Sequence, residues 1–149
     1  MTDNQEIAMI TFRSGYNCAQ AVLTTWADEM DFDYDMALNI ATGFGGGMGR
    51  LQETCGAVTG AFMVIGIYCS NKYRDSGERK DKSYSMIREF AGKFTEIHGT
   101  TSCSELLGCD LLTEEGMQKM ISESLHESIC EQCVIHSVGL LEALMEDGR

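Results

Sequence analysis

The 149-residue sequence contains no proline, few cationic side chains and no apolar run long enough to cross a membrane. Without proline, no helix is interrupted from within, and a proline-rich linker is excluded. Lys and Arg number 11 against 23 Asp and Glu, which gives a net charge of −12. Such a chain repels phosphate backbones, so we expect no nucleic-acid partner. The longest mostly apolar stretch, residues 57–69, falls short of the roughly 17–25 residues of a membrane-spanning helix, so we expect no membrane span.

Signals for secretion and for β-strands are also lacking. The first residues are polar and acidic and show no signal-peptide pattern, so we expect a cytoplasmic protein. Apolar residues recur at helical spacing between glycines and capping residues. We therefore predict that residues 1–149 form a single all-α domain. It is expected to be a helical bundle of about six or seven helices, with a central glycine-containing buried helix.

The helical segments are bounded by capping residues and glycines. They are predicted at about residues 4–13, 18–30, 36–42, 54–68, 84–98, 103–107, 113–125 and 130–145. The charged segment 71–82 is predicted to be a solvated turn or a frayed helix start. The glycine-rich segment 43–49 lacks a preceding strand and the Lys-Ser/Thr of a phosphate loop, so a tight turn with positive φ angles is favoured. Bare backbone that approaches a cofactor or a reactive cysteine is the second interpretation of this segment.

Seven cysteines are too few for a small disulfide scaffold, which usually exceeds about 8–10% cysteine. In a reducing compartment they suggest metal or redox chemistry. Four of them follow a capping residue by one or two positions, in Asn17-Cys18, Thr54-Cys55, Ser102-Cys103 and Ser128-Ile129-Cys130. The field at a helix N-terminus favours the thiolate and lowers a cysteine pKa. Because a thiolate is both a nucleophile and a metal ligand, we predict that these four sulfurs meet in one site. The alternative is that they pack as small apolar side chains.

The C-x-x-C pair Cys130 and Cys133 would place two sulfurs on one helix face, close enough for a disulfide or for two metal ligands. No βαβ pattern surrounds the pair, and the other cysteine spacings match no local ferredoxin or zinc-ribbon pattern. Any metal site must therefore be assembled by the tertiary fold. His126 would share the stripe of Cys130 and Cys133 only on a continuous helix. The predicted cap at Ser128 competes with that, and His126 is left out of the predicted site.

Three blocks of sequence together resemble the C_GCAxxG_C_C family of redox-active proteins. They are Tyr16-Asn17-Cys18-Ala19-Gln20-Ala21-Val22, residues 43–50 and Thr54-Cys55-Gly56-Ala57-Val58-Thr59-Gly60-Ala61. Residues 103–108, and Cys130 with its following helix, fit the same pattern, so the resemblance covers about residues 8–144. It implies a small helical prokaryotic protein, of a kind described as encoded near transporter genes. The implied family-defining cysteines are Cys18, Cys55, Cys103 and Cys130. Cys133 is an addition, so whether Cys130 or Cys133 is the fourth family cysteine stays open; Cys69 and Cys109 are further extras.

The leading hypothesis is a redox protein with Cys18, Cys55, Cys103, Cys130 and Cys133 as redox thiols. An iron–sulfur cluster or another thiophilic metal, held by Cys18, Cys55, Cys103 and Cys130, is slightly favoured over dithiol/disulfide cycling. The alternative is a non-enzymatic accessory or binding module, associated with a transporter, with structural zinc or simply packed cysteines. Enzymatic activity, the identity of a redox or transporter partner, and assembly as a homo-oligomer stay open.

Overall fold

The computed structural model describes residues 1–147 and confirms an all-α helical bundle, with no β-strand among those residues. The helices are α1 (Asp3–Arg13), α2 (Cys18–Thr24), α3 (Tyr34–Ala41), α4 (Gly45–Met48), α5 (Gly56–Lys72), α6 (Ser76–His98), α7 (Cys103–Leu107), α8 (Glu114–Ser122) and α9 (Glu131–Asp147). A 3₁₀ turn, Thr42–Phe44, precedes α4, and a π-helical turn, His126–Cys130, leads into α9.

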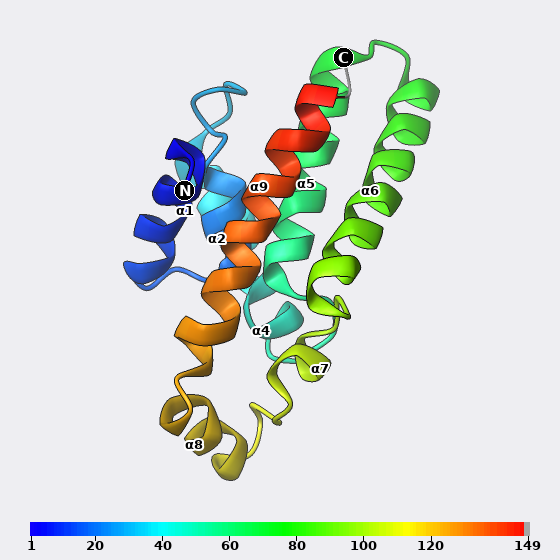
Figure 1. Ribbon diagram of the computed structural model, residues 1–149. Helices are drawn as coiled ribbons and strands as arrows, with labels where there is room; N and C mark the ends of the chain where they lie inside the picture. Colours follow the sequence, from blue (N-terminus) through cyan, green and yellow to red (C-terminus); the bar gives the residue numbers. More distant parts are fainter. Residues whose placement is uncertain (148–149) are drawn as a thin grey trace.

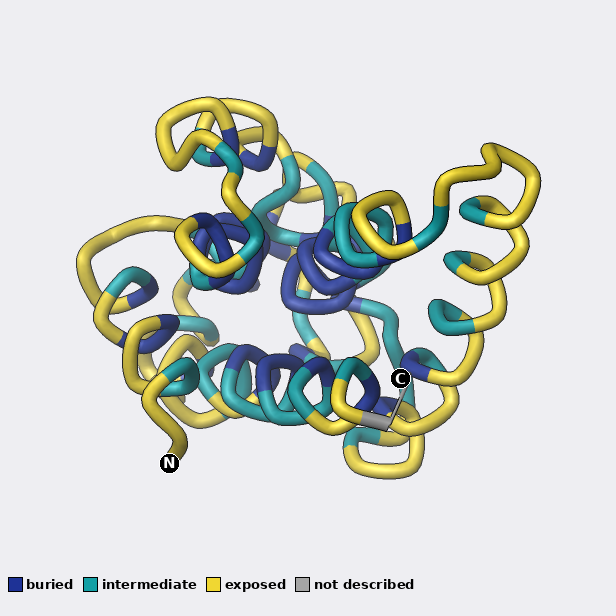
Figure 2. The backbone as a smooth tube through the Cα atoms, turned by 90° about the horizontal axis from the view of Figure 1, so that it is seen from above, coloured by how far each residue is buried: buried dark blue, intermediate teal, exposed yellow. Residues whose placement is uncertain are grey.

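Three long helices form the body of the bundle. In Figure 1, α9 runs beside α5 while α6 stands on the far side, and α6 packs against both. The short α2 packs on α5, and α1 packs on α2 and α9. The small helices α4 and α7 lie at one end, with α8 beyond them. Seen from above, buried residues face the middle of the bundle, and the outer side of α6 is exposed (Figure 2). The N-terminal ends of α2, α5 and α7 therefore lie at the end of the bundle near α4 and α7.

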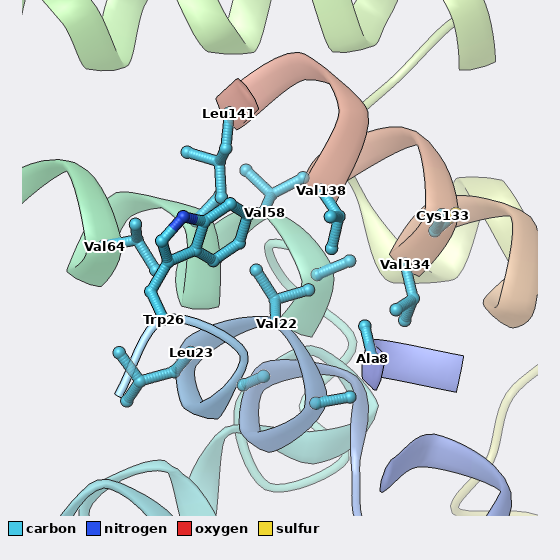
Figure 3. Close-up of a cluster of buried hydrophobic side chains, with 14 of the residues drawn as sticks. Ala8, Val22, Leu23, Trp26, Val58, Val64, Cys133, Val134, Val138 and Leu141 are labelled. Carbon is cyan, nitrogen blue, oxygen red and sulfur yellow. The ribbon is translucent and has the colours of Figure 1, made fainter. Parts of the chain in front are cut away.

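The core is continuous around α5, which confirms the predicted central glycine-containing helix. Trp26 lies among Val58, Val64 and Leu141 in Figure 3, and all four are 1% exposed or less. Burying a large apolar side chain of this kind stabilises the fold by about 1.5–3 kcal/mol each. The glycines of α5 allow α2 to approach closely. The N-terminal ends of α2 and α5 therefore lie near each other.

Two predicted segments are wrong in extent. The segment predicted as 18–30 stops being helical at Thr24, and the chain then turns through Trp26. The segment 71–82, predicted as a solvated turn or a frayed helix start, contains the end of α5 at Lys72 and the start of α6 at Ser76. The helix begins there because the Asp75 carboxylate accepts a hydrogen bond from the Glu78 N–H (2.9 Å) and caps α6. The charges that suggested a loop are good helix formers on a solvated face.

The helical stretch His126–Glu146 is, by length and composition alone, apolar enough to cross a bilayer, and within the described chain it alone passes this test. Core helices of bundles pass the same test. Here Val134, Val138 and Leu141 are fully buried against the other helices. The predicted cap at Ser128 divides this stretch in the sequence, so its length becomes evident only in the structure.

Candidate functional site

One cavity of about 750 Å³ lies where the N-terminal ends of α2, α5 and α7 and the π turn before α9 come together. Five of the seven cysteines line it: Cys18, Cys55, Cys103, Cys130 and Cys133. All seven cysteines are free thiols. The structure thus brings the four cysteines that were predicted to lie at helix starts, and the second cysteine of the C-x-x-C pair, into one place.

A short backbone bridge holds the starts of α5 and α7 together. Thr54 and Ser102 form an isolated antiparallel bridge. The Cys55 N–H donates to the Thr101 carbonyl (2.8 Å), and the Cys103 N–H donates to the Glu53 carbonyl (2.7 Å). These bonds fix Cys55 and Cys103 side by side although they are far apart in the sequence.

Glycines on α5 bring α2, and with it Cys18, against the same place. A Cβ at Gly60 would lie 2.8 Å from the Ala19 carbonyl oxygen, and one at Gly56 would lie 3.2 Å from the Cys18 Cβ. Only glycine allows this approach of two backbones. The close packing of α2 on α5 at these glycines therefore also sets Cys18 beside Cys55.

The start of α2 is a capping box, as predicted. The Gln20 N–H donates to Asn17 Oδ1 (2.8 Å), and the Asn17 N–H donates to Gln20 Oε1 (2.9 Å). The same two side chains also donate to the Thr42 carbonyl (Asn17 Nδ2, 3.0 Å) and the Leu38 carbonyl (Gln20 Nε2, 3.0 Å). One pair of residues therefore starts the helix that carries Cys18 and anchors the glycine-rich loop next to it.

The glycine-rich loop is a turn with positive φ, as predicted, at Gly46 (65°), Gly47 (67°) and Gly49 (63°). A Cβ at Gly47 would lie 2.6 Å from the Cys103 Cβ. The second interpretation of this loop, bare backbone approaching a cysteine, therefore also describes the structure.

The predicted cap at Ser128 is wrong. The chain turns instead at Ser124, which has a φ of 49°, and the Ser128 N–H donates to the Ser124 carbonyl (3.0 Å). The π turn passes directly into α9. Cys130 therefore lies inside a continuous helical stretch, not at a capped helix start.

This continuity puts His126 on the cavity wall with Cys130 and Cys133. Its ring stacks on Phe12, with centroids 4.4 Å apart. The spacing of these three residues was visible in the sequence, but the cap predicted at Ser128 would have broken the helix that places them on one face.

Cys55 is itself the N-cap residue of α5, so the predicted cap at Thr54 is also wrong. The side-chain hydrogen bond with Cys133 is the main reason that the pKa of Cys55 lies below its ordinary value. Burial opposes this, while the backbone N–H groups of Ala57 and Val58 lower the pKa further. Negative charge on Cys55 is thus stabilised chiefly by Cys133 and to a smaller extent by the helix start.

The thiols form two interacting pairs. The hydrogen bond with Cys55, then burial and the charge of Cys55, raise the pKa of Cys133. The hydrogen bond with Cys130, then burial, raise the pKa of Cys18 well above its ordinary value. In the first pair, Cys133 is positioned to stabilise negative charge on Cys55.

The prediction that helix starts lower every cysteine pKa is wrong for Cys18 and Cys103. Burial, and then the charges of Cys55 and Cys130, raise the pKa of Cys103 to about 12. Desolvation and neighbouring sulfurs outweigh the partial charge of a short helix.

Sequence reasoning missed Gln52, a nearly buried residue with a φ of 56°. Its Nε2 donates to the Cys109 carbonyl, and its Oε1 accepts from the Leu111 N–H, both at 2.8 Å. Its side chain also forms a hydrogen bond with Cys103, which acts to lower the pKa of that thiol. No sequence signal distinguishes this glutamine from a solvated one.

The two extra cysteines lie outside the cavity wall. Cys69 is buried in the main core near the end of α5. Cys109 is half-buried in the loop after α7, close enough to Cys103 for its charge to raise the pKa of that thiol.

The arrangement of the sulfurs also bears on a bound metal. Within residues 1–147, no group of three or more His, Cys, Asp or Glu side chains is arranged so that it could hold a metal ion. The donor types suit a thiophilic metal, but the described side chains stand as pairs and not as a converging set of ligands.

A helical bundle with five thiols around one cavity defines a small cysteine-centred protein. The chain belongs to the C_GCAxxG_C_C family, described as "Putative redox-active protein", whose sequence pattern matches residues 16–144. It is also 26% identical over 111 residues to an "Uncharacterized protein" of Archaeoglobus fulgidus, covering 69% of this chain and 74% of that protein. No solved structure matches the chain.

Proposed function

We propose that the protein exchanges electrons through thiol–disulfide chemistry, with Cys55 as the attacking thiol and Cys133 as the resolving thiol. The observation that carries this proposal is the pairing of these two side chains on the wall of one cavity. Two hydrogen-bonded thiols need little movement to become a disulfide. Membership of a redox-active family agrees with this chemistry.

In the first step the Cys55 thiolate attacks one sulfur of an incoming disulfide. A bond forms between the two sulfurs, the disulfide bond of the substrate breaks, and its other sulfur leaves as a thiolate that takes up a proton. The lowered pKa of Cys55 supplies the thiolate.

In the second step Cys133 loses its proton and attacks the Cys55 sulfur, which releases the second substrate thiol. The substrate gains two electrons, and Cys55 and Cys133 end as a disulfide. The hydrogen bond with Cys55 and the charge of Cys55 both raise the pKa of Cys133, in addition to burial and the charges of Cys130 and Cys103. The two contributions of Cys55 disappear once Cys55 is in the mixed disulfide, so the resolving thiol ionises more easily at that stage.

The half-buried pair Cys18 and Cys130 provides a second dithiol on the same cavity. Oxidation of both pairs would take four electrons per chain. Cys103 interacts electrostatically with Cys55 and Cys130, one member of each pair. Attack of Cys103 on the Cys55 sulfur of a Cys55–Cys133 disulfide would form a Cys55–Cys103 disulfide and release Cys133 as a thiol. Attack of Cys130 on Cys103 would then release Cys55, and attack of Cys18 on Cys130 would release Cys103 and leave a Cys18–Cys130 disulfide.

The test is to oxidise the metal-free protein with a small disulfide and to map the resulting bonds by mass spectrometry. We expect Cys55–Cys133 and Cys18–Cys130 disulfides. Cys133→Ser should trap the substrate thiol on Cys55, and Cys69→Ser is the matched control that should leave the map unchanged. Slow, uniform modification of all seven thiols, with no preferred pair, would contradict the proposal and support a packed-cysteine accessory module.

A second candidate is an iron–sulfur cluster or another thiophilic metal, favoured by the presence of five sulfur donors on one cavity wall. Cys18, Cys55, Cys103 and Cys130 would hold it, and a cluster would supply one-electron transfer. Metal and sulfide analysis with an absorption spectrum, on protein purified without air, distinguishes the candidates. Stoichiometric iron and sulfide with visible absorption favours the cluster. Zinc without a redox response, and with unfolding on chelation, indicates a structural site. Colourless, metal-free protein with reactive thiols favours disulfide exchange.

For the setting, we propose a cytoplasmic protein without a membrane span, because seven free thiols suit a reducing compartment. The partner is proposed to be another redox protein or a transporter component, and not a nucleic acid, because the net charge is −12. Association into a homo-oligomer would be read from the mass in solution.

A further inference from the structure

Two histidines that the proposed thiol chemistry does not use meet between α6 and α9. His98 is the last residue of α6, and His136 lies on α9. His98 Nε2 and His136 Nδ1 are 2.9 Å apart. Both rings are half-buried and line no part of the cysteine cavity.

Packing holds the two rings in this position. The His98 ring lies 4.5 Å from the ring of Phe94, which is fully buried one turn earlier on α6. The His98 and His136 rings are inclined at 48°, with centroids 4.9 Å apart. Two imidazole nitrogens on separate helices therefore face each other at the edge of the core.

We propose that His98 and His136 form a two-histidine site for a divalent transition-metal ion with cis ligands at right angles, of which Ni²⁺ is the type. With a metal–nitrogen distance of about 2.0–2.1 Å, nitrogens 2.9 Å apart subtend about 90° at the metal. That is the cis angle of octahedral or tetragonal coordination. Tetrahedral Zn²⁺ would need the nitrogens about 3.3–3.4 Å apart, so the helices would have to separate.

The protonation state of the pair permits this. Burial, and secondarily the charge of His136, lower the pKa of His98, which favours the neutral imidazole that a metal ion requires. One ring carries the proton between the two nitrogens. When the metal binds, that proton is lost from the shared position and the ring is protonated on its outer nitrogen, so no net proton is released.

The surroundings also favour a cation. The chain carries a net charge of −12, which attracts divalent cations toward its surface. No third side-chain ligand completes the site among residues 1–147. The remaining coordination positions would be taken by water, so the site is open on its exposed side.

The test is proton NMR of the reduced full chain during titration with Ni²⁺. Each coordinated imidazole keeps one N–H on its outer nitrogen, and contact with paramagnetic Ni²⁺ moves that signal far outside the normal spectrum. We expect two such exchangeable signals and one bound ion that is lost from both His98→Gln and His136→Gln. His126→Gln, which changes the histidine next to the thiols, is the control and should keep both signals.

The thiols are a competing site, and the histidine variants distinguish the two. Absence of shifted imidazole signals in the native chain would overturn the proposal without any variant. Their persistence in His98→Gln, or their loss in His126→Gln, would overturn it as well. The histidine site does not use the thiols, so the Cys133→Ser variant should keep both signals.

Discussion

Replacing Gly60 by alanine tests how the cysteine cavity is assembled. The added Cβ would lie 2.8 Å from the Ala19 carbonyl oxygen and 3.1 Å from its Cα, both backbone atoms that no side-chain rotation can move away. Helix α2 must therefore shift outward from α5. Overpacking of this kind costs about 1–3 kcal/mol.

Gly66→Ala is the matched control, because Gly66 lies on the same helix and a Cβ there meets nothing within 4 Å. Both replacements gain the same intrinsic helix preference, about 0.8–1 kcal/mol. Their difference therefore isolates the clash. We expect Gly60→Ala to be less stable than Gly66→Ala by about 1–3 kcal/mol.

The assay is unfolding in urea under reducing conditions, followed by helical circular dichroism, with the midpoint compared at constant slope. The same variants are then oxidised and mapped. Because α2 carries Cys18 at its first turn, Gly60→Ala should also reduce the yield of the Cys18–Cys130 disulfide, while Gly66→Ala should not. Equal stability of the two variants would refute the proposed glycine contact between α2 and α5.

Three further results are expected. Gly47→Ala should lower the free energy of unfolding by about 1–3 kcal/mol, because it adds a side chain at positive φ against Cys103; Gly43→Ala, which meets nothing within 4 Å, is its control in the same urea assay. Arg13 holds the pKa of Glu131 below its ordinary value. This pair therefore stabilises the fold at pH values above the pKa of Glu131 in the unfolded chain, and the effect is lost as the pH falls through the pKa of Glu131 in the folded chain. Unfolding curves of Arg13→Gln and the native chain should differ at neutral pH and converge in acid. Cys69→Ser and Cys109→Ser should leave the disulfide map or any metal absorption unchanged, and loss of either signal would move the site to other cysteines.

Local signals predicted most of the elements. The Asn17–Gln20 capping box and the Ser102 cap start their helices where the sequence indicated, because both ends of the hydrogen bond lie within one turn. Long-range competition explains the failures. Ser128 has the residue type of a cap, but the positive φ at Ser124 turns the chain earlier.

The helix starts in the sequence predicted that the sulfurs lie in one site. They did not predict which contacts hold the segments that carry the sulfurs together. The Thr54–Ser102 bridge and the contact of Gly60 with Ala19 join segments that no local spacing relates. Gln52, which holds Cys103, has no motif around it. Such contacts depend on tertiary packing, which single-sequence periodicity does not contain.

Burial and proximity together limit how much negative charge the thiols can carry. A buried thiolate is stable only where hydrogen-bond donors face it, and a second thiolate beside it is opposed by desolvation and by repulsion. The pKa values follow this rule: that of Cys55 is lowered, while those of Cys18, Cys103 and Cys133 are raised. In the metal-free cavity, negative charge is therefore placed most easily on Cys55, the thiol that the proposed disulfide exchange uses for attack. A bound cation would remove the limit by compensating several thiolates at once, so the number of ionised thiols at neutral pH distinguishes the two forms of redox chemistry.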